Sequence, residues 1–451
     1  MTTPSDPPSE PNRRGFLRQG MGLATAVGLT VSSVAGGDDR KAGADLLRKF
    51  LESCVLKKQT LDRFLDPRAQ VWAKFDPELG YLLRNACLRD GVDGCHTLQR
   101  YETTGQRKQV NFTDQPCRIN TYGDSFTQGA QVSDGETWQE VLAAHFCESI
   151  RNFGIGGYGV YQAYRRLLRT EPTELGAKYL IFNIWGDDHY RSIYAWRWMS
   201  FPPNTFAARS DVLFHANPWV HARLDPATGE LVEKPNPCPD AKTLYKLCDP
   251  EFVFDRFQQD EVTHALLAGR EGVVADRTVL EKMAATLQVK ELDLGSPDAV
   301  QKTANRLLHT YAVRVGMKLM EKLSQFCAKH EKKLLVLLSY PGSAVAHACS
   351  DTPPGAAGNV DWHPQVFKEH LAAHKVPFVD TLPKHVAEFK TFRLTPKEYV
   401  GRYYIGHYNP KGNHFFAYAI KDELLAWLDP KPPTYQNEKE LRIHFKGYLP
   451  G

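Results

Sequence analysis

The feature that most constrains the fold is an alternation of expected strands and helices that begins at Arg118. Short apolar runs typical of buried strands are followed by segments with apolar residues at helical spacing. Such an alternation predicts an α/β fold, with a parallel sheet covered on both faces and ligands at the carboxyl ends of its strands. The expected strands are 118–122, 149–153, 179–185, 333–338 and 376–379, and the expected helices are 138–146, 161–168, 301–330 and 413–428.

Three other regions flank or interrupt this α/β domain, which is expected over residues 117–430. Residues 38–116 predict an N-terminal extension, with one helix near residue 50 and then short strands and turns. A long insertion at about 189–300 separates the two halves of the domain and contains an expected hairpin turn at 225–229. An insertion of this size at a strand end is typical of a lid or a substrate wall. Residues 431–451 form a Pro-rich tail.

Residues 1–37 resemble a twin-arginine export signal. Arg13-Arg14 precedes a weakly apolar stretch from Met21 to Ala35, and Ser33-Val34-Ala35 offers small residues for cleavage. The stretch is too short for a stable membrane span. The resemblance implies a periplasmic or extracellular protein that contacts a membrane only if the signal stays uncleaved.

The composition excludes several classes of protein. Lys plus Arg is 56 and Asp plus Glu is 52, so the net charge is +4, which argues against nucleic-acid binding. The nine cysteines include no CxxC pair, which argues against a structural zinc site. Cys87 with Cys95 and Cys238 with Cys248 are the local candidates for disulfides, although the sequence leaves connectivity open. No metal and no cofactor are expected.

Two residues carry the candidate chemistry. Ser125 lies in Gly123-Asp124-Ser125, directly after the first strand of the α/β domain. A serine hydroxyl needs a base to act as a nucleophile near neutral pH. The best candidate is His407, in a late loop that opens into the last helix, where Asn409 is expected to cap the helix and Pro410 to occupy its first position.

Three blocks resemble the SGNH (GDSL-type) hydrolase superfamily: the Gly-Asp-Ser turn, the segment Asn152-Phe153-Gly154-Ile155-Gly156-Gly157, and the late His–Asn–Gly loop. The resemblance implies a flavodoxin-like three-layer α/β/α sandwich with a parallel sheet. It makes Ser125 the nucleophile and His407 the general base. It also implies an oxyanion hole formed by the backbone amides of Ser125 and Gly157, the latter chosen among several neighbouring glycines.

The third block departs from the family pattern. It is Gly186-Asp187-Asp188-His189, so Asp187 falls where the family has an Asn that donates to the oxyanion. A carboxylate about 4 Å from an oxyanion would cost roughly 4 kcal/mol. Asp187 is therefore expected to be protonated, turned away or used differently, unless Asp188 is the equivalent residue. Pairing of both acids with Arg191 is the simpler structural alternative.

The acid that usually precedes the catalytic histidine is also missing, because Tyr404 and Ile405 occupy its places. A backbone carbonyl is one possible orienting partner for His407, and Asp187 or Asp188 is another. Aspartate and histidine side chains here lack the spacing of a metal site.

These features predict an exported serine esterase whose substrate is a small-molecule or carbohydrate ester. The export signal and the aromatic run at 190–201 favour an O-acylated carbohydrate. A carbohydrate O-acyltransferase and a catalytically silent SGNH-like binding protein are the two alternatives.

Overall fold

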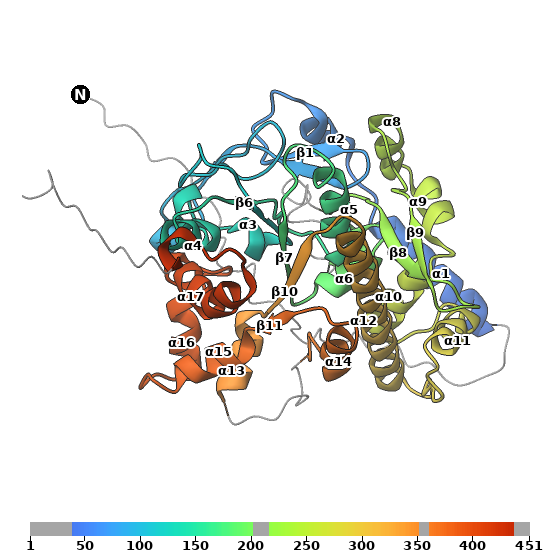
Figure 1. The fold of residues 1–451 in the computed structure, drawn as a ribbon. Coiled ribbons are helices and arrows are strands. Elements are labelled where there is room, and N and C mark those ends of the chain that lie inside the picture. Colours follow the sequence, from blue (N-terminus) through green and yellow to red (C-terminus); the bar gives the residue numbers. More distant parts are fainter. Residues whose placement is uncertain (1–37, 202–215, 351–359, 437–451) are drawn as a thin grey trace, which may run out of the picture.

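The computed structural model describes residues 38–201, 216–350 and 360–436 (Figure 1). The export signal predicted for residues 1–37 and most of the predicted tail lie outside the described residues. No helix in the described ranges has both the length and the apolar character needed to cross a membrane.

The core of the structure is a five-stranded, fully parallel sheet, as the alternation predicts. Its spatial order is β11-β10-β7-β5-β6, so the chain passes from β5 outward to β6 and then returns to the other side of β5 with β7. Numbered in chain order, this is the doubly wound arrangement 2-1-3-4-5. Its strands are β5 (Ile119–Tyr122), β6 (Ile150–Asn152), β7 (Tyr179–Trp185), β10 (Lys333–Ser339) and β11 (Phe378–Asp380).

Helices cover both faces of the sheet, which gives three layers (Figure 1). One face carries α4 (Trp138–Phe146), α13 (Gly342–Cys349), α15 (Leu382–Phe389), α16 (Pro396–Tyr403) and α17 (Pro410–Trp427). The other carries α5 (Val160–Thr170), α6 (Asp188–Ile193), α12 (Pro297–Lys329) and α14 (Gln365–Ala373). Helices therefore shield both faces of the sheet from solvent, which explains why β7 is buried along nearly its whole length.

The N-terminal extension contains α1 (Asp38–Ser53), α2 (Lys58–Leu65) and two small antiparallel pairs, in agreement with the expected helix, strands and turns. The pairs are β1 (Ala73–Asp76) with β2 (Gly80–Leu83), and β3 (Ala86–Leu88) with β4 (Thr97–Gln99).

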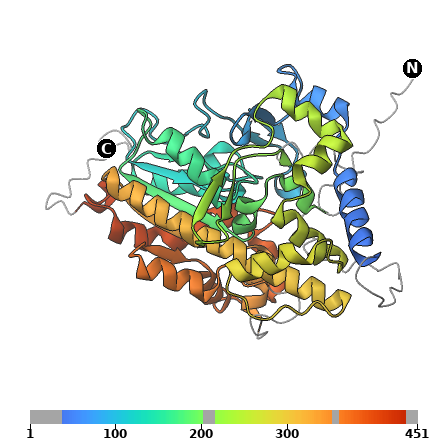
Figure 2. The ribbon, with the colours of Figure 1, turned by 90° about the vertical axis from the view of Figure 1, so that its right-hand side faces the viewer.

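The described part of the insertion contains the predicted hairpin, β8 (His221–Leu224) and β9 (Leu231–Lys234), and is otherwise mainly helical. Its helices are α8 (Ala241–Leu244), α9 (Pro250–Phe257), α10 (Glu261–Glu271) and α11 (Arg277–Thr286). Helix α10 packs along α12, and α9 packs against α1 (Figure 2). The insertion thus packs against both the outer helical layer and the N-terminal extension.

The proposed local disulfides do not form, since all nine cysteines are free thiols. In the β3–β4 pair, the residue opposite Cys87 is Leu98, so the strand register keeps Cys95 out of the facing position. Cys238 is buried, whereas Cys248 ends a short helical turn over Tyr245–Cys248. The two cysteines of each proposed pair are close along the chain but are not bonded to each other in the structure.

Candidate active site

The three blocks that carry the candidate chemistry follow three strands of the sheet at their carboxyl ends. Ser125 begins the single-turn helix α3 (Ser125–Gln128) just after β5, the glycine-rich segment follows β6, and Asp187 follows β7. Strand β6 lies on one side of β5, whereas β7 and the later strands lie on the other side. A doubly wound sheet leaves a crevice for ligands at this point, between β5 and β7.

Ser125 and His407 meet although 282 positions separate them along the chain. The Oγ of Ser125 lies 2.8 Å from Nε2 of His407. The other nearby acceptor, Oδ2 of Asp124, is farther from Oγ at 3.2 Å, while Oδ1 of Asp124 accepts the N–H of Phe126 and so caps α3. The hydroxyl is therefore positioned to give its proton to the imidazole.

Gln131 occupies the place of the missing orienting acid. Its Oε1 lies 3.0 Å from Nδ1 of His407 and also accepts the backbone N–H of His407 at 2.7 Å. Its Nε2 donates to the carbonyl oxygen of Asp90 at 3.0 Å, which fixes the orientation of the amide. Because an amide oxygen only accepts, the proton of the neutral ring resides on Nδ1, and the lone pair of Nε2 faces Ser125.

The surroundings of His407 keep its ring uncharged. The ring of Phe126 lies 5.0 Å from the imidazole, centroid to centroid, and Phe126 itself stacks on Trp185. Burial, and secondly the positive charge of Arg191, lower the pKa of His407 to about 4. At neutral pH the imidazole is thus in the form that accepts a proton.

The loop that carries His407 is held by the two residues that follow the histidine. Asn409 caps α17 by accepting the N–H of Gly412 at 2.9 Å, with Pro410 at the first helical position, as the sequence predicts. The next residue, Tyr408, is buried and hydrogen-bonds to the buried His385 at 2.9 Å. A histidine followed directly by a buried tyrosine and a helix cap has little freedom to leave Ser125.

The glycine-rich segment approaches the serine closely. A Cβ on Gly156 would lie 2.7 Å from Oε1 of Gln128 and 3.4 Å from Cβ of Ser125, so no side chain fits between them. The carbonyl oxygen of Gly156 accepts the hydroxyl of Tyr81 at 2.5 Å. Since the C=O and N–H of one trans peptide point in opposite directions, this bond turns the N–H of Gly157 away from Tyr81.

Gly157 also differs from its neighbours in conformation, with a φ of +87°. Gly154, Gly156 and Gly159 do not have a positive φ. Among the described residues, no acceptor lies within hydrogen-bond distance of the Gly157 N–H. The N–H of Ser125 is one of the N-terminal donors that a helix leaves unpaired. Both amides are therefore available to a ligand.

The turn of Ser125 is held rigidly from behind. Arg107 is buried and donates to the carbonyl oxygens of Gln128 and Gly129, both at 2.6 Å. Gln139 and Asn152 donate to the carbonyl oxygen of Thr127, each at 2.8 Å. These bonds satisfy the carbonyl groups of a helix too short to bond them itself, so the position of the serine is over-determined.

Asp187 and Asp188 pair with Arg191 rather than with His407; Asp188 and Arg191 are buried, whereas the side chain of Asp187 is 36% exposed. Arg191 forms ion pairs with Asp187 and Asp188, the latter at 2.8 Å, and its Nη1 lies 3.6 Å from Oδ2 of Asp124. Burial raises the pKa of both Asp124 and Asp188, and in Asp188 the charge of Asp124 adds to this. One guanidinium thus lies close to three carboxyl groups beside the ends of β5 and β7, and the raised pKa values of Asp124 and Asp188 favour their uncharged forms.

This cluster corrects two expectations. Asp188, the possible orienting acid, bonds to Arg191 and to the N–H of Trp185 at 2.9 Å, and Gln131 takes the position on His407 instead. Asp187 was predicted in the oxyanion hole, but a carboxylate paired with arginine accepts hydrogen bonds and donates none. The pairing with Arg191, the simpler alternative, is what the structure contains.

Several supporting residues come from the N-terminal extension, where the sequence pointed to no chemistry. Tyr81 orients the glycine segment, Asp90 fixes the Gln131 amide, and Arg107 holds the serine turn. Tyr101 supplies no catalytic group, but its hydroxyl oxygen accepts a hydrogen bond from Nε2 of Gln128 at 2.8 Å. The sequence contains only a weak signal for these supporting residues, because they are polar residues in a region of short strands and belong to no recognised motif.

The aromatic run at the start of the insertion is largely buried. Tyr194, Trp196 and Trp198 belong to the hydrophobic core, and Trp196 packs on Phe257 with ring centroids 5.6 Å apart. These rings stabilise the insertion, so they offer little support for sugar stacking.

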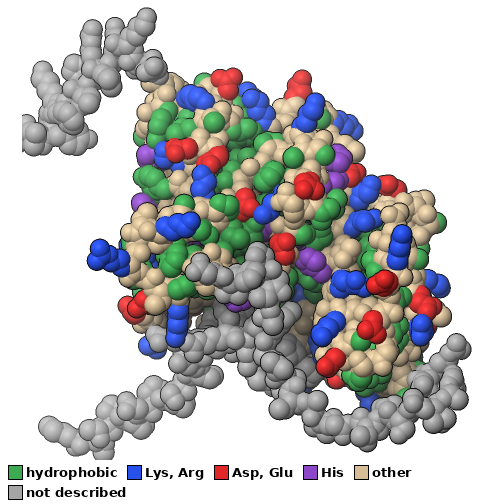
Figure 3. Space-filling model, turned by 90° about the horizontal axis from the view of Figure 1, so that it is seen from below, with side chains coloured by type: hydrophobic (Ala, Val, Ile, Leu, Met, Phe, Trp, Pro, Cys, Tyr) green, Lys and Arg blue, Asp and Glu red, His purple; other side chains and the backbone are tan. Residues whose placement is uncertain are grey.

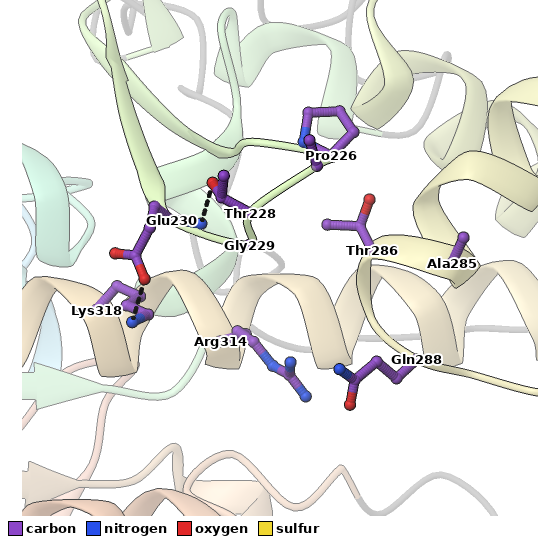
Figure 4. Close-up of a pocket in the computed structure, with 10 residues that line it drawn as sticks. Pro226, Thr228, Gly229, Glu230, Ala285, Thr286, Gln288, Arg314 and Lys318 are labelled. Carbon is purple, nitrogen blue, oxygen red and sulfur yellow. Dashed lines mark hydrogen bonds and ion pairs between the residues drawn. The ribbon is translucent and has the colours of Figure 1, made fainter.

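A separate surface cavity of about 290 Å³ lies between the insertion hairpin and α12 (Figure 4). Pro226 to Glu230 of the hairpin and Arg314 and Lys318 of α12 are among the residues that line it. None of the candidate site residues lies in this cavity. On the face shown in Figure 3, acidic and basic side chains are interspersed rather than grouped by sign.

No protein-family model matches this chain, and no curated protein matches it in sequence.

Proposed function

We propose that this protein is a serine hydrolase of the SGNH type that cleaves ester bonds. The observation that carries the proposal is the chain of contacts from Ser125 Oγ to His407 Nε2 at 2.8 Å and from His407 Nδ1 to Gln131 Oε1 at 3.0 Å. A nucleophile bonded to a base, with the base oriented by a third group, is the arrangement that activates a serine.

The fold supports the same proposal. The strand order is that of a flavodoxin-like sandwich, and the three motif blocks lie at the carboxyl ends of β5, β6 and β7. The late histidine enters from the loop before α17. This arrangement supports the proposed SGNH-type hydrolase.

In the proposed reaction, Ser125 Oγ attacks the ester carbonyl while its proton moves to His407 Nε2. The amides of Ser125 and Gly157 donate to the developing oxyanion, where each such donor typically contributes ~10²–10³ in rate. Collapse of the tetrahedral intermediate expels the alcohol, which takes the proton from His407. Water, deprotonated by the same Nε2, then releases the acid and restores Ser125.

Gln131 gives this centre a distinctive electrostatic character. A neutral amide fixes the tautomer of His407 but supplies no negative charge to stabilise an imidazolium ion. The low pKa of His407 is the consequence, because burial and Arg191 act on the ring without a facing carboxylate. We propose a Ser–His–Gln centre that works at lower pH than a Ser–His–Asp triad.

Labelling by a fluorophosphonate tests the proposal directly. The wild-type protein should react with the probe at one residue, and Ser125→Ala should remove the label. Ser53→Ala, which changes an exposed serine at the end of α1, should label normally. A wild-type protein that resists the probe at every pH would instead be the catalytically silent binding protein.

The pH dependence is a second prediction. Only neutral His407 accepts the proton of Ser125, and its pKa is lowered to about 4. Activity is therefore expected to be complete at neutral pH, to persist in mildly acidic buffer, and to be lost as the pH falls through about 4. Measured kcat/KM for a chromogenic ester should show this acid limb, with circular dichroism at each pH confirming a folded protein. A limb near the ordinary histidine pKa would show that a carboxylate reaches His407.

We propose that the substrate is a small-molecule or carbohydrate ester and that the protein is exported by its twin-arginine-type signal. Supplying an acyl donor with and without a carbohydrate acceptor separates a hydrolase from an acyltransferase: free acid in both cases indicates the hydrolase, and acyl transfer to the sugar indicates the alternative.

A further inference from the structure

A second group of ligand-type side chains lies on the outer helical layer, between α12 and α14. His370 and His374 are one turn apart on α14 and its end, with ring centroids separated by 4.1 Å. Glu321 faces them from α12: its Oε1 lies 3.4 Å from Nε2 of His370 and 3.9 Å from Nε2 of His374. One ligand atom from each residue falls within 4.8 Å of the other two.

These separations suit a zinc ion. Zn²⁺ binds imidazole nitrogen and carboxylate oxygen at about 2.0–2.2 Å in tetrahedral geometry, which places neighbouring ligand atoms about 3.4 Å apart. The measured 3.4 and 3.9 Å are close to this value, and small side-chain rotations bring all three atoms around one ion. Two imidazoles and one carboxylate, with water in a fourth position, are a common ligand set for zinc.

The hydrogen bonds around the cluster prepare His374 as a ligand. Its Nδ1 lies 2.9 Å from the carbonyl oxygen of His370, and because a carbonyl only accepts, the proton belongs on Nδ1. The lone pair is then on Nε2, which faces Glu321. Metal-binding histidines are typically fixed in this way, with the other ring nitrogen bonded to a carbonyl or carboxylate.

His370 is suited to the same purpose. Burial, and secondly the nearby His374, lower the pKa of His370, which favours the neutral ring that a metal needs. Its Nε2 also lies 3.2 Å from the carbonyl oxygen of Met317. Because a carbonyl only accepts, Nε2 of the neutral ring carries the proton in the metal-free protein, so binding an ion there requires the tautomer with the proton on Nδ1.

The nearest cation does not occupy the ligand position. Lys318 lies 3.5 Å from Oε2 of Glu321, the oxygen that does not face the histidines, and 3.1 Å from Oε1 of Glu230 (Figure 4). The shorter contact holds Lys318 toward the insertion hairpin. Oε1 of Glu321 remains directed at the two imidazoles.

We propose that Glu321, His370 and His374 form a Zn²⁺ site that joins α14 to α12. The side chain of His374 is 45% exposed, so water reaches the ion from the solvent side and completes its coordination. The site does not include Ser125 or His407 and is independent of the proposed hydrolase. Its role is to fix α14, whose Phe367 packs against the buried His189 in the outer layer.

The test uses the full chain freed of metal by a chelator and then titrated with ZnCl₂ by calorimetry. One Zn²⁺ per chain should bind, and the melting temperature should rise by a few degrees as binding stabilises the folded state. His374→Ala should lose both effects, and Glu321→Gln should weaken binding at least about tenfold. His414→Ala, an exposed histidine on α17, should bind zinc like the wild type.

Cobalt substitution separates this site from the free cysteines. Co²⁺ bound by two imidazoles and a carboxylate should give weak visible bands without a thiolate charge-transfer band. Stoichiometric zinc binding that survives in His374→Ala, a thiolate band, or the absence of any stoichiometric binding would each overturn the proposal.

Discussion

Replacing His407 by alanine should lower kcat/KM for an ester substrate by about 10⁴-fold or more, the largest effect expected of any single change together with Ser125→Ala. Among the described residues, two groups within hydrogen-bond reach of Ser125 Oγ can take up a proton: His407, and Asp124, whose carboxyl is farther away and bonded to the α3 backbone. A loss of this size corresponds to about 5 kcal/mol of transition-state stabilisation.

The two substitutions should not be additive. Once the base is gone the serine hydroxyl is a poor nucleophile, so Ser125→Ala in the same chain should remove little more activity, leaving what the backbone amides and binding provide. Steady-state kinetics of both single variants and the double variant measure this, with melting temperatures to confirm folding. His414→Ala is the matched control and should keep wild-type activity. If the losses of the two single variants multiply in the double variant, or if His407→Ala keeps a near-normal rate, the base is a residue other than His407.

The second large effect is expected at Gln131. Gln131→Leu removes the acceptor on His407 Nδ1 while keeping a side chain of similar size, so the imidazole loses its fixed tautomer and kcat should fall about 10²-fold or more. Gln131 has a φ of +67°, and leucine bears the same backbone strain as glutamine there. The exposed Gln115→Leu serves as the control and should leave kcat unchanged.

Gln131→Glu gives the opposite electrostatic change. A carboxylate at Nδ1 favours the imidazolium ion, so the pKa of His407 should rise from about 4 and the acid limb of the pH profile should move toward neutral pH. The variant cannot donate to the carbonyl oxygen of Asp90, so the free energy of unfolding should fall by about 1–3 kcal/mol. An unmoved acid limb in this variant, with normal kcat in Gln131→Leu, would remove Gln131 from the mechanism.

The local patterns of the sequence predicted the buried framework well. The helix over 138–146 and the strand over 179–185 have the bounds found in α4 and β7, because a fully apolar strand and an amphipathic helix depend mainly on their own residues. Helices α13 to α16 were not predicted. A signal for α16 was present: Thr395 and Glu398 form a capping box, with Pro396 at the first helical position.

The insertion was less well described by the sequence. Its hairpin was predicted from a turn motif, which acts over a few residues. Its assignment as a lid depends on where the helices of the insertion pack. One of them, α10, packs along α12 of the outer layer. Packing partners of an amphipathic helix are set by surfaces from distant segments, which a single sequence pattern does not specify.

By itself, the sequence determined the strands of the parallel sheet, four of the helices that cover it and the residue types placed at the strand ends, because hydrophobic periodicity and helix capping are local properties of the chain. It thereby identified Ser125 and His407. Only the tertiary structure decided what surrounds them: Gln131 on the far side of the imidazole, Arg191 drawing in Asp187 and Asp188, and Glu321 opposite the two histidines of α14. Hydrogen bonds and ion pairs depend on distances of a few ångströms in space, and separation along the chain does not encode them.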